Sequence, residues 1–226
     1  AVARPAMGAF AHEAVAVDDV MQHLYLTEDR PNGKLYRFTP DNYPDLSSGL
    51  LEVAEVVGDP LVGASLTWHE VPDPSGVSEQ TRLQVEASTD FDGGEGIAFS
   101  DGIIYFATKG DNRIWALDTD AQTLEIIYDF DTASGANRIL SGVDNLTVTA
   151  SGEILVCEDG GDMQLCVILP DRSVIPLLQV VGQNASEISG PAFSPDGRRL
   201  YFNSNRGSRN GLGLGITYEI MLPFSA

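Results

Sequence analysis

Basic residues are scarce in this chain. It carries only two lysines, Lys34 and Lys109, and 13 basic side chains against 33 acidic ones, for a formal net charge of −20. A field of this sign repels phosphate backbones, so we expect no binding to nucleic acid. An acidic surface favours cations as partners, or it serves as a solvated shell suited to high salt.

Cysteine and long apolar runs are also rare. The two cysteines, Cys157 and Cys166, lack the spacing and the companion ligands of a zinc site, and we expect free, buried thiols rather than a disulfide. No apolar run approaches the length of a membrane span, so no membrane-spanning segment is expected. A GxSxG motif and a phosphate-cradling P-loop are absent from the sequence as well.

The pattern that dominates the chain is a repeated unit of short strands. In residues 144–170, alternating apolar runs are separated by turns rich in glycine, serine and aspartate, which is typical of an antiparallel meander. Similar units begin near residues 12, 95 and 189. Repeated units of three or four strands predict propeller blades. We therefore expect an all-β chain, a β-propeller with about four recognisable blades, forming a single domain over residues 1–226.

The segment 41–94 is less regular than the rest of the chain. Leu50–Val57 and Ala64–Val71 are expected to be strands, one of them the outer strand of the first blade. Pro72–Asp92 has the composition of a long surface loop, in which Leu83–Val85 is a further candidate strand. No helix of more than a turn or two is expected, and Ala185–Ile188 is the nearest candidate.

The spacing inside each repeat is nearly constant. From the residue that opens the first strand to the residue that closes the second, the interval is 15 residues in the first repeat and 14 in the others. Antiparallel hairpins bring these two positions to one edge. We therefore expect four pairs at one rim: Glu13 with Glu28, Glu95 with Lys109, Asp144 with Glu158, and Ser189 with Asn203. Asp29, Asp159 and Glu187 lie within two residues of these positions.

Carboxylates crowded at one rim repel one another unless a cation neutralises them. Ligands that are all oxygen suit hard divalent cations, calcium above all. The rim therefore predicts a metal site, and the alternative is that propeller loops are acidic only because of their turn chemistry. The predicted metal ligands are Glu13, Glu28, Asp29, Glu95, Asp144, Glu158 and Glu187.

Lys109 interrupts the acidic pattern of the rim. It either balances the charge of its neighbours or holds an anionic substrate over the metals, as cations do at phosphoryl-transfer sites. Asn112 follows closely, and we take Lys109, Glu95 and Asn112 as candidate catalytic residues. His12 is a candidate ligand or acid, although a lone histidine beside a strand is more often structural.

Several motifs occur in a fixed order along almost the whole chain. They are His12-Glu13, Tyr25–Asp29, Leu35–Phe38, Glu95-Gly96, Thr108–Asn112, Asp144–Leu146, Glu187–Gly190 and Phe193–Gly197. Together they resemble the PhoX-type bacterial alkaline phosphatases and their uncharacterised relatives. The resemblance implies a six-bladed propeller with calcium and iron at the channel mouth, which hydrolyses phosphate esters and is exported by the twin-arginine route, hence periplasmic or secreted. By the same resemblance, metal-ligand positions match Glu13, Glu28 or Asp29, Glu95, Asp144 and Glu187.

Three departures from the family's pattern stand out. No Cys-Glu-type ligand motif precedes His12-Glu13, Gly93-Gly94 replace an arginine before the glutamate, and Asn205-Arg206 replace a Gln-His pair. The chain also opens on Ala1, which predicts a processed, trimmed or fragmentary chain. These departures indicate a chain closer to the uncharacterised relatives, and we expect a truncated member. It is expected to be either part of a six-bladed propeller or an incomplete ring, whose open edge pairs with another copy or a second chain; the alternative is a compact, rearranged ring.

The function expected from the sequence is metal-dependent hydrolysis of a small phosphate ester at an acidic channel mouth. One alternative is a calcium-dependent propeller lactonase or esterase, which needs no phosphate-binding cation. The other is a non-enzymatic scaffold that calcium stabilises. Activity toward phosphate esters or lactones separates the first two, and a metal-replete but inert protein would favour the third.

Overall fold

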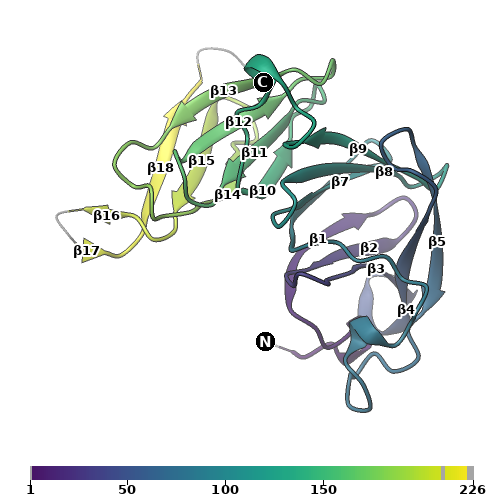
Figure 1. Cartoon of the computed structure of the whole chain (residues 1–226). Coiled ribbons are helices and arrows are strands. Elements are labelled where there is room, and N and C mark those ends of the chain that lie inside the picture. Colours follow the sequence, from purple (N-terminus) through teal and green to yellow (C-terminus); the bar gives the residue numbers. More distant parts are fainter. Residues whose placement is uncertain (1, 210–211, 223–226) are drawn as a thin grey trace. The chain divides into compact units, whose positions relative to one another are not determined.

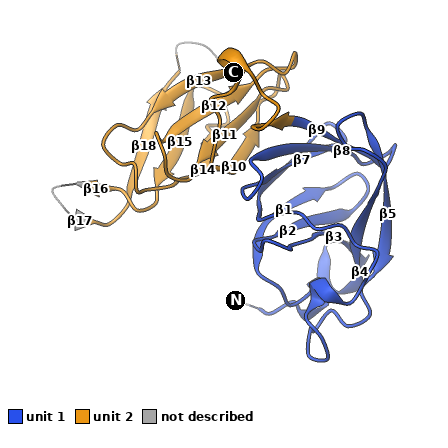
Figure 2. Cartoon of the chain, in the orientation of Figure 1, with its two compact units in different colours: residues 1–127 blue, residues 128–226 orange. Residues whose placement is uncertain are grey.

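The computed structural model describes residues 2–209 and 212–222, which form two compact units, residues 1–127 and 128–226 (Figures 1 and 2). The described residues are almost entirely strands and turns. Their only helices are single 3₁₀ turns, η1 (Pro5–Met7), η2 (Thr81–Leu83) and η3 (Gly135–Asn137). The expected absence of longer helices is therefore confirmed for this part of the chain. Ile188 begins a strand, so the Ala185–Ile188 helix candidate was wrong.

Unit 1 contains two four-stranded antiparallel meanders. The first comprises β1 (His12–Asp18), β2 (His23–Glu28), β3 (Leu35–Asn42) and β4 (Asp45–Val57). The second comprises β6 (Gly94–Ser100), β7 (Ile103–Thr108), β8 (Arg113–Asp118) and β9 (Thr123–Asp129). A further strand, β5 (Ala64–Glu70), pairs along β4 and meets β9 through Ala64 and Ser65. The nine strands therefore form one sheet in which β5 joins the outer strands of the two meanders.

Unit 2 contains the other two blades. One is the four-stranded meander β10 (Val143–Val148), β11 (Ile154–Glu158), β12 (Gln164–Ile168) and β13 (Val174–Gln179). The other has three strands, β14 (Ile188–Phe193), β15 (Arg199–Ser204) and β18 (Ile216–Met221), with the two-residue strands β16 (Ser208–Arg209) and β17 (Leu212–Gly213) between the last two. The predicted fold class, all-β with four recognisable propeller blades, is confirmed. The single domain over residues 1–226 and the closure of the ring stay predictions.

Aromatic packing anchors the long connection between β5 and β6. Phe91 is buried, and its ring centroid lies 5.4 Å from that of Phe106 and 5.3 Å from that of Trp115. Such edge-to-face contacts add to the hydrophobic gain of burying the ring. The connection is therefore fixed to the core at its end, and Leu83–Val85 do not form the candidate strand, since Thr81–Leu83 is a 3₁₀ turn.

The two cysteines lie on neighbouring strands but on opposite faces of the sheet. Cys157 pairs with Leu165, and Cys166 pairs with Val156. Paired residues share a face and successive residues alternate between faces, so the two sulfurs point away from each other. Both thiols are free and buried, as expected, and burial raises the pKa of Cys166 to about 12.

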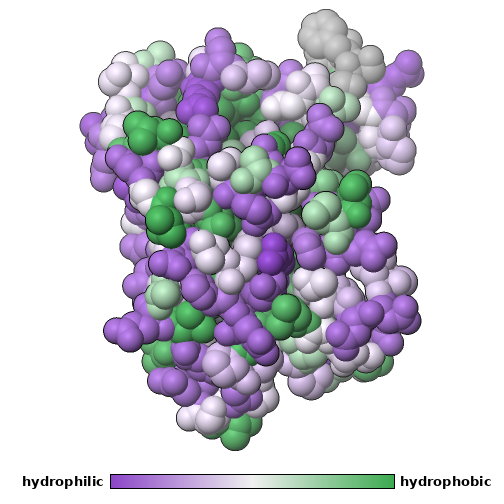
Figure 3. Space-filling view, turned by 90° about the vertical axis from the view of Figure 1, so that its right-hand side faces the viewer, coloured by the Kyte–Doolittle hydropathy of each residue, from purple (hydrophilic) through white to green (hydrophobic). Residues whose placement is uncertain are grey.

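The face of the protein shown in Figure 3 carries scattered rather than gathered apolar side chains. Figure 3 shows a face on which hydrophilic residues are interspersed with small groups of hydrophobic ones. Val62, Val77 and Leu214 are among the exposed apolar residues, and single residues of this kind are common on soluble folds. None of the helices in the described ranges is long or apolar enough to cross a bilayer.

Candidate functional site

Every blade has a β-bulge near the start of its first strand. The regular register is interrupted after His12 in β1, after Gly94 in β6, after Val143 in β10 and after Ser189 in β14. A bulge sets two residues against one and changes the direction of the side chains within it. In the first three blades the first bulged residue is an acid: Glu13, Glu95 or Asp144. The bulges thus present three predicted ligands at equivalent positions.

In three blades the paired residues differ from the expected ones: one member is displaced by one residue in the first and third blades, and both members are displaced by one residue in the second. Glu28 pairs with His12 rather than Glu13, Thr108 pairs with Gly94, and Glu158 pairs with Val143. The extra residue in each bulge shifts the register, which a count along the sequence does not detect. In the fourth blade the predicted pair of Ser189 and Asn203 is confirmed.

The residues that close the second strands are polar and buried in all four blades. Glu28, Thr108, Glu158 and Ser204 are all fully buried. The carboxylate of Glu158 accepts hydrogen bonds from the backbone N–H groups of Ser141, at 3.0 Å, and Gln164, at 2.8 Å. Burial raises its pKa to about 7. Glu158, a predicted metal ligand, therefore already holds the backbone at Ser141, before β10, and at Gln164, where β12 begins.

Glu28 has a comparable structural role in the first blade. The hydroxyl of Tyr36 donates to its carboxylate at 3.0 Å, and a guanidinium nitrogen of Arg82 lies 3.3 Å from it. Burial raises the pKa of Glu28 above its usual value. The pairing with Arg82 ties the long β5–β6 connection to the end of β2.

The residue after each buried position occupies an equivalent place in its own blade. These residues are Asp29, Lys109, Asp159 and Asn205, and the backbone N–H of each donates to a carbonyl just before the first strand of its blade, at 2.8 to 3.0 Å. Lys109 is therefore equivalent to Asp29 and Asp159, and not to the buried Glu28 and Glu158, with which the repeat spacing grouped it. Asp29 is exposed, whereas Lys109 and Asp159 are partly buried.

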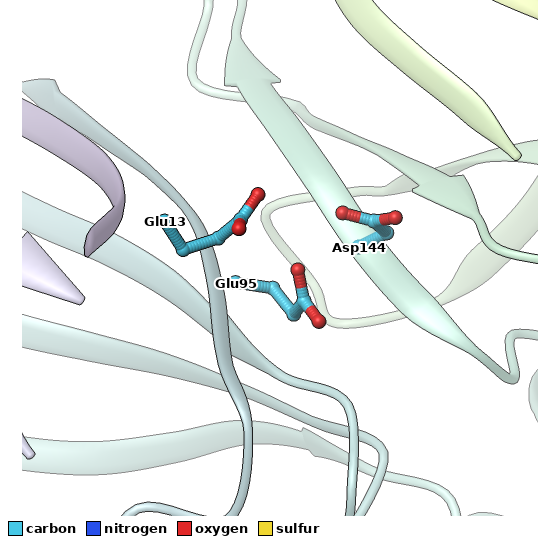
Figure 4. A group of neighbouring side chains, drawn as sticks. All are labelled: Glu13, Glu95 and Asp144. Atoms are coloured by element: carbon cyan, nitrogen blue, oxygen red, sulfur yellow. The ribbon is translucent and has the colours of Figure 1, made fainter. Parts of the chain in front are cut away.

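In unit 1 the structure brings Glu13, Glu95 and Lys109 together. Carboxylate oxygens of Glu13 and Glu95 lie within 4.8 Å of each other, and Figure 4 shows both side chains. Glu95 is only 2% exposed, and the ammonium of Lys109 forms an ion pair with it. Thr27 holds the backbone here, because its hydroxyl accepts from Ala14 N–H at 3.2 Å and donates to the carbonyl of Glu95 at 2.6 Å.

The turn that follows Lys109 is tightly constrained. Thr108 donates its hydroxyl proton to Asp111 and accepts one from the indole N–H of Trp115, at 2.9 Å. A Cβ on Gly110 would lie 2.2 Å from the carboxyl group of Asp92, so a larger residue here would displace that side chain. Asn112 has a φ of 51°, a conformation that asparagine tolerates better than most residues. The conformation of Asn112 gives it a role in the turn, beside the catalytic role predicted for it.

In unit 2 a second acidic group contains Asp144, Asp159 and Glu187. Each offers a carboxylate oxygen within 4.8 Å of the others, and Asp144 is buried. Arg206 joins two of them: it forms an ion pair with Asp159 and donates to Glu187 at 2.8 Å. Its Nε–H also donates to the carbonyl of Ala185 at 3.0 Å. In the sequence, Arg206 stands out only as a departure from the family's pattern, because no local pattern signals an ion pair between residues 47 positions apart.

His12, the remaining candidate ligand, makes contacts that support the fold. Its Nε2 is 3.0 Å from the carbonyl of Gly8, and its ring stacks on Phe10 with 3.7 Å between centroids. Both acidic groups therefore consist of carboxylates alone. Such oxygen donors fit hard cations such as calcium, and they do not fit a zinc site of the usual nitrogen and sulfur ligands.

Comparison with known families and structures gives one extensive match. The family model described as alkaline phosphatase PhoX matches residues 1–206. No curated protein matches the chain by sequence.

The solved structures similar to this chain are distant. A luciferin-regenerating enzyme is 13% identical, with 96% of this chain and 93% of that chain covered, at a TM-score of 0.47. The calcium-binding protein regucalcin from Agrobacterium tumefaciens is 14% identical over 96% and 93%, at 0.44. A gluconolactonase from Xanthomonas campestris is 15% identical over 97% and 88%, at 0.41. With TM-scores below 0.5, these likenesses carry no argument about function.

Proposed function

This chain belongs to the alkaline phosphatase PhoX family, and on that basis we propose that it hydrolyses small phosphate esters in a metal-dependent reaction. The observation that carries the proposal, beside the family match, is the arrangement in unit 1. There a lysine ammonium is held against the buried carboxylate of Glu95, with a carboxylate of Glu13 close by. A cation beside a group of metal-ligand carboxylates is what phosphoryl transfer requires.

The proposed metal ligands are the carboxylates at the rim. They are Glu13, Asp29 and Glu95 in unit 1 and Asp144, Asp159 and Glu187 in unit 2, for calcium first and iron second. When bound, such ions neutralise the charge of a phosphoryl group and lower the pKa of a coordinated water. Glu28 and Glu158 are proposed to support this set from below, because their carboxylates already hold loops.

The residues of this chain contribute position and charge to the proposed reaction. Glu95 fixes the ammonium of Lys109 at the rim, where it binds the phosphoryl group of the ester. As negative charge builds on the phosphoryl and leaving-group oxygens, a preorganised ammonium stabilises it more strongly than it stabilises the ground state. Asn112 is proposed to act by holding the turn that carries Lys109.

We also propose where the protein is located and how it assembles. A periplasmic or secreted location accords with the family match and with acidic oxygen ligands for calcium. Pairing of an open blade edge with another copy or a second chain is proposed because unpaired edge strands are prone to associate.

The test is hydrolysis of 4-nitrophenyl phosphate by protein loaded with calcium and iron, compared with hydrolysis of a simple lactone. We expect release of phosphate that a chelator abolishes, and no lactone opening. Lactone turnover without phosphate release would favour the calcium-dependent lactonase instead. A metal-loaded protein that turns over neither substrate would favour the scaffold.

A further inference from the structure

Unit 1 contains a cavity whose lining is basic, in a protein with 33 acids and 13 bases. Its volume is about 450 Å³, and it is lined by Ala9, Phe10, Ala11, Arg30, Gly76, Gln80 and Arg82. Two of these seven residues are arginines and none is acidic. By contrast, the cavity between β5 and β8 is lined in part by Asp118 and Glu125.

Most guanidinium N–H groups of the two arginines donate to no acceptor in the described part of the chain. Arg30 is exposed, and within the described part of the chain its guanidinium has no hydrogen-bond or ion-pair partner. Arg82 uses Nε to donate to Asn32 at 3.2 Å and one terminal nitrogen to contact Glu28 at 3.3 Å. A guanidinium carries five N–H donors, so most of the donors on this pair of side chains are available to a ligand. Arg206 in unit 2 differs, because three acceptors already engage it.

The walls of the cavity are held in place by the surrounding chain. Ala9 donates its N–H to the carbonyl of Pro74 at 2.8 Å and accepts from the hydroxyl of Thr81 at 2.9 Å. The ring of Phe10 is stacked between His12 and Tyr36, at centroid distances of 3.7 and 4.1 Å. Fixed walls lower the entropic cost of binding, and the cost that is left is mainly that of ordering the side chain of Arg30.

The cavity adjoins the carboxylates of unit 1 through the backbone. Ala11, which lines the cavity, lies two residues before Glu13, and its carbonyl accepts from the N–H of Asp29 at 3.0 Å. The carbonyl of Arg30 accepts from the N–H of Gly93 at 2.8 Å, and Gly93 lies two residues before Glu95. The residues that line the cavity and the residues that carry Glu13 and Glu95 are therefore neighbours along the same hydrogen-bonded backbone.

We propose that the Arg30–Arg82 cavity binds a second anionic group, a carboxylate or a phosphate, of an ester whose phosphoryl group lies at the rim. The inference rests on the proposed phosphatase function and narrows its substrates to esters with two acidic groups. Guanidinium groups suit this role, because their fork matches the oxygens of a carboxylate or a phosphate. The excess of acids elsewhere repels such substrates, so two arginines with free donors are the means by which unit 1 attracts one.

The test is calorimetric binding of unreactive phosphonates to the metal-loaded full chain. ω-Carboxyalkyl phosphonates with chains of increasing length are compared with alkyl phosphonates of the same length. We expect at least one length to gain affinity from its carboxylate, and Arg30→Gln to remove that gain. The loss is about tenfold, which is the effect of about 1.4 kcal/mol of charge-assisted hydrogen bonding.

Arg198→Gln is the matched control, because it removes the same charge from an exposed turn of unit 2. We expect it to keep the gain in affinity. A gain that persists in Arg30→Gln, or no gain at any chain length, would overturn the cavity proposal while turnover of simple esters still supported the phosphatase. Arg30-dependent binding without turnover of any ester would overturn the phosphatase and leave the anion-binding cavity standing.

Discussion

The ammonium of Lys109 forms an ion pair with the carboxylate of Glu95, which lies in the bulge of β6 and is 2% exposed. The lysine side chain itself is 35% exposed. One partner is thus anchored in the protein and the other reaches solvent. This asymmetry is suited to binding, because a buried carboxylate orients a cation that can still meet a ligand. Substitution of Lys109 is therefore the most direct way to distinguish the proposed functions.

Lys109→Met should abolish most phosphatase activity without unfolding the protein. The substitution keeps the aliphatic stem and removes the charge, so we expect turnover of 4-nitrophenyl phosphate to fall roughly 10²-fold, the usual effect of losing one electrostatic donor. Lys34→Met is the control at the only other lysine, whose ammonium donates to the Ser88 carbonyl and to Asp90. It should keep the turnover of the wild type. Equal rates for Lys109→Met and wild type would rule out the role given to Lys109.

Calcium should stabilise the protein against unfolding. If the rim carboxylates bind calcium only in the folded state, a hundredfold excess over the dissociation constant raises the free energy of unfolding by about 2.7 kcal/mol. Chelation should lower the melting temperature, and Glu95→Gln should reduce the shift that calcium causes. Calorimetric melting in calcium and in chelator measures both effects. A melting temperature that is the same in calcium and in chelator would argue against any metal site at the rim.

Thr27→Val should loosen the backbone that carries Glu95. The valine has nearly the same shape as threonine but cannot accept from Ala14 or donate to the carbonyl of Glu95. We expect the free energy of unfolding to fall by about 1–3 kcal/mol, because one buried and one partly buried backbone group lose their partner. Chemical denaturation gives the value. A loss of stability with an unchanged calcium shift would mean that Thr27 supports the fold but not the site.

Asp73 should contribute to stability at neutral pH and lose that contribution in acid. Hydrogen bonds from the hydroxyls of Ser75 and Ser78 lower the pKa of Asp73 from 3.8 to about 2. A folded-state pKa below the unfolded one stabilises the protein above the unfolded pKa, and the effect disappears as pH falls through the folded pKa. Asp73→Asn should therefore melt below wild type at pH 5, and the difference should shrink between about pH 4 and 2. A constant difference across that range would exclude this linkage.

Much of the fold follows from local sequence. Alternating apolar residues and turn signals placed the blades near residues 12, 95, 144 and 189, and strands begin there at His12, Gly94, Val143 and Ile188. Strand periodicity is a local property, so a single sequence carries it. The free thiols were also predictable, since two cysteines without companion ligands give no reason for a metal or a bridge.

The composition of the rim was only partly accessible from sequence. Glu13, Glu95 and Asp144 were found because the repeat aligns them, and their bulges present them at equivalent positions. The sequence did not indicate that Glu28 and Glu158 are buried whereas Asp29 is exposed. A bulge adds one residue to one strand, and this changes the facing of a side chain without changing any local pattern in the sequence.

The sequence by itself thus determined the all-β class, the four repeats and the acidic residues that each repeat offers. Only the tertiary structure decided which of those acids are buried, that Arg206 joins Asp159 to Glu187, and that Arg30 and Arg82 line one cavity. The physical reason is the range of the interactions. Strand and turn preferences act over a few residues, whereas ion pairs and cavities form between residues that are some 50 positions apart and meet only when the sheet is assembled.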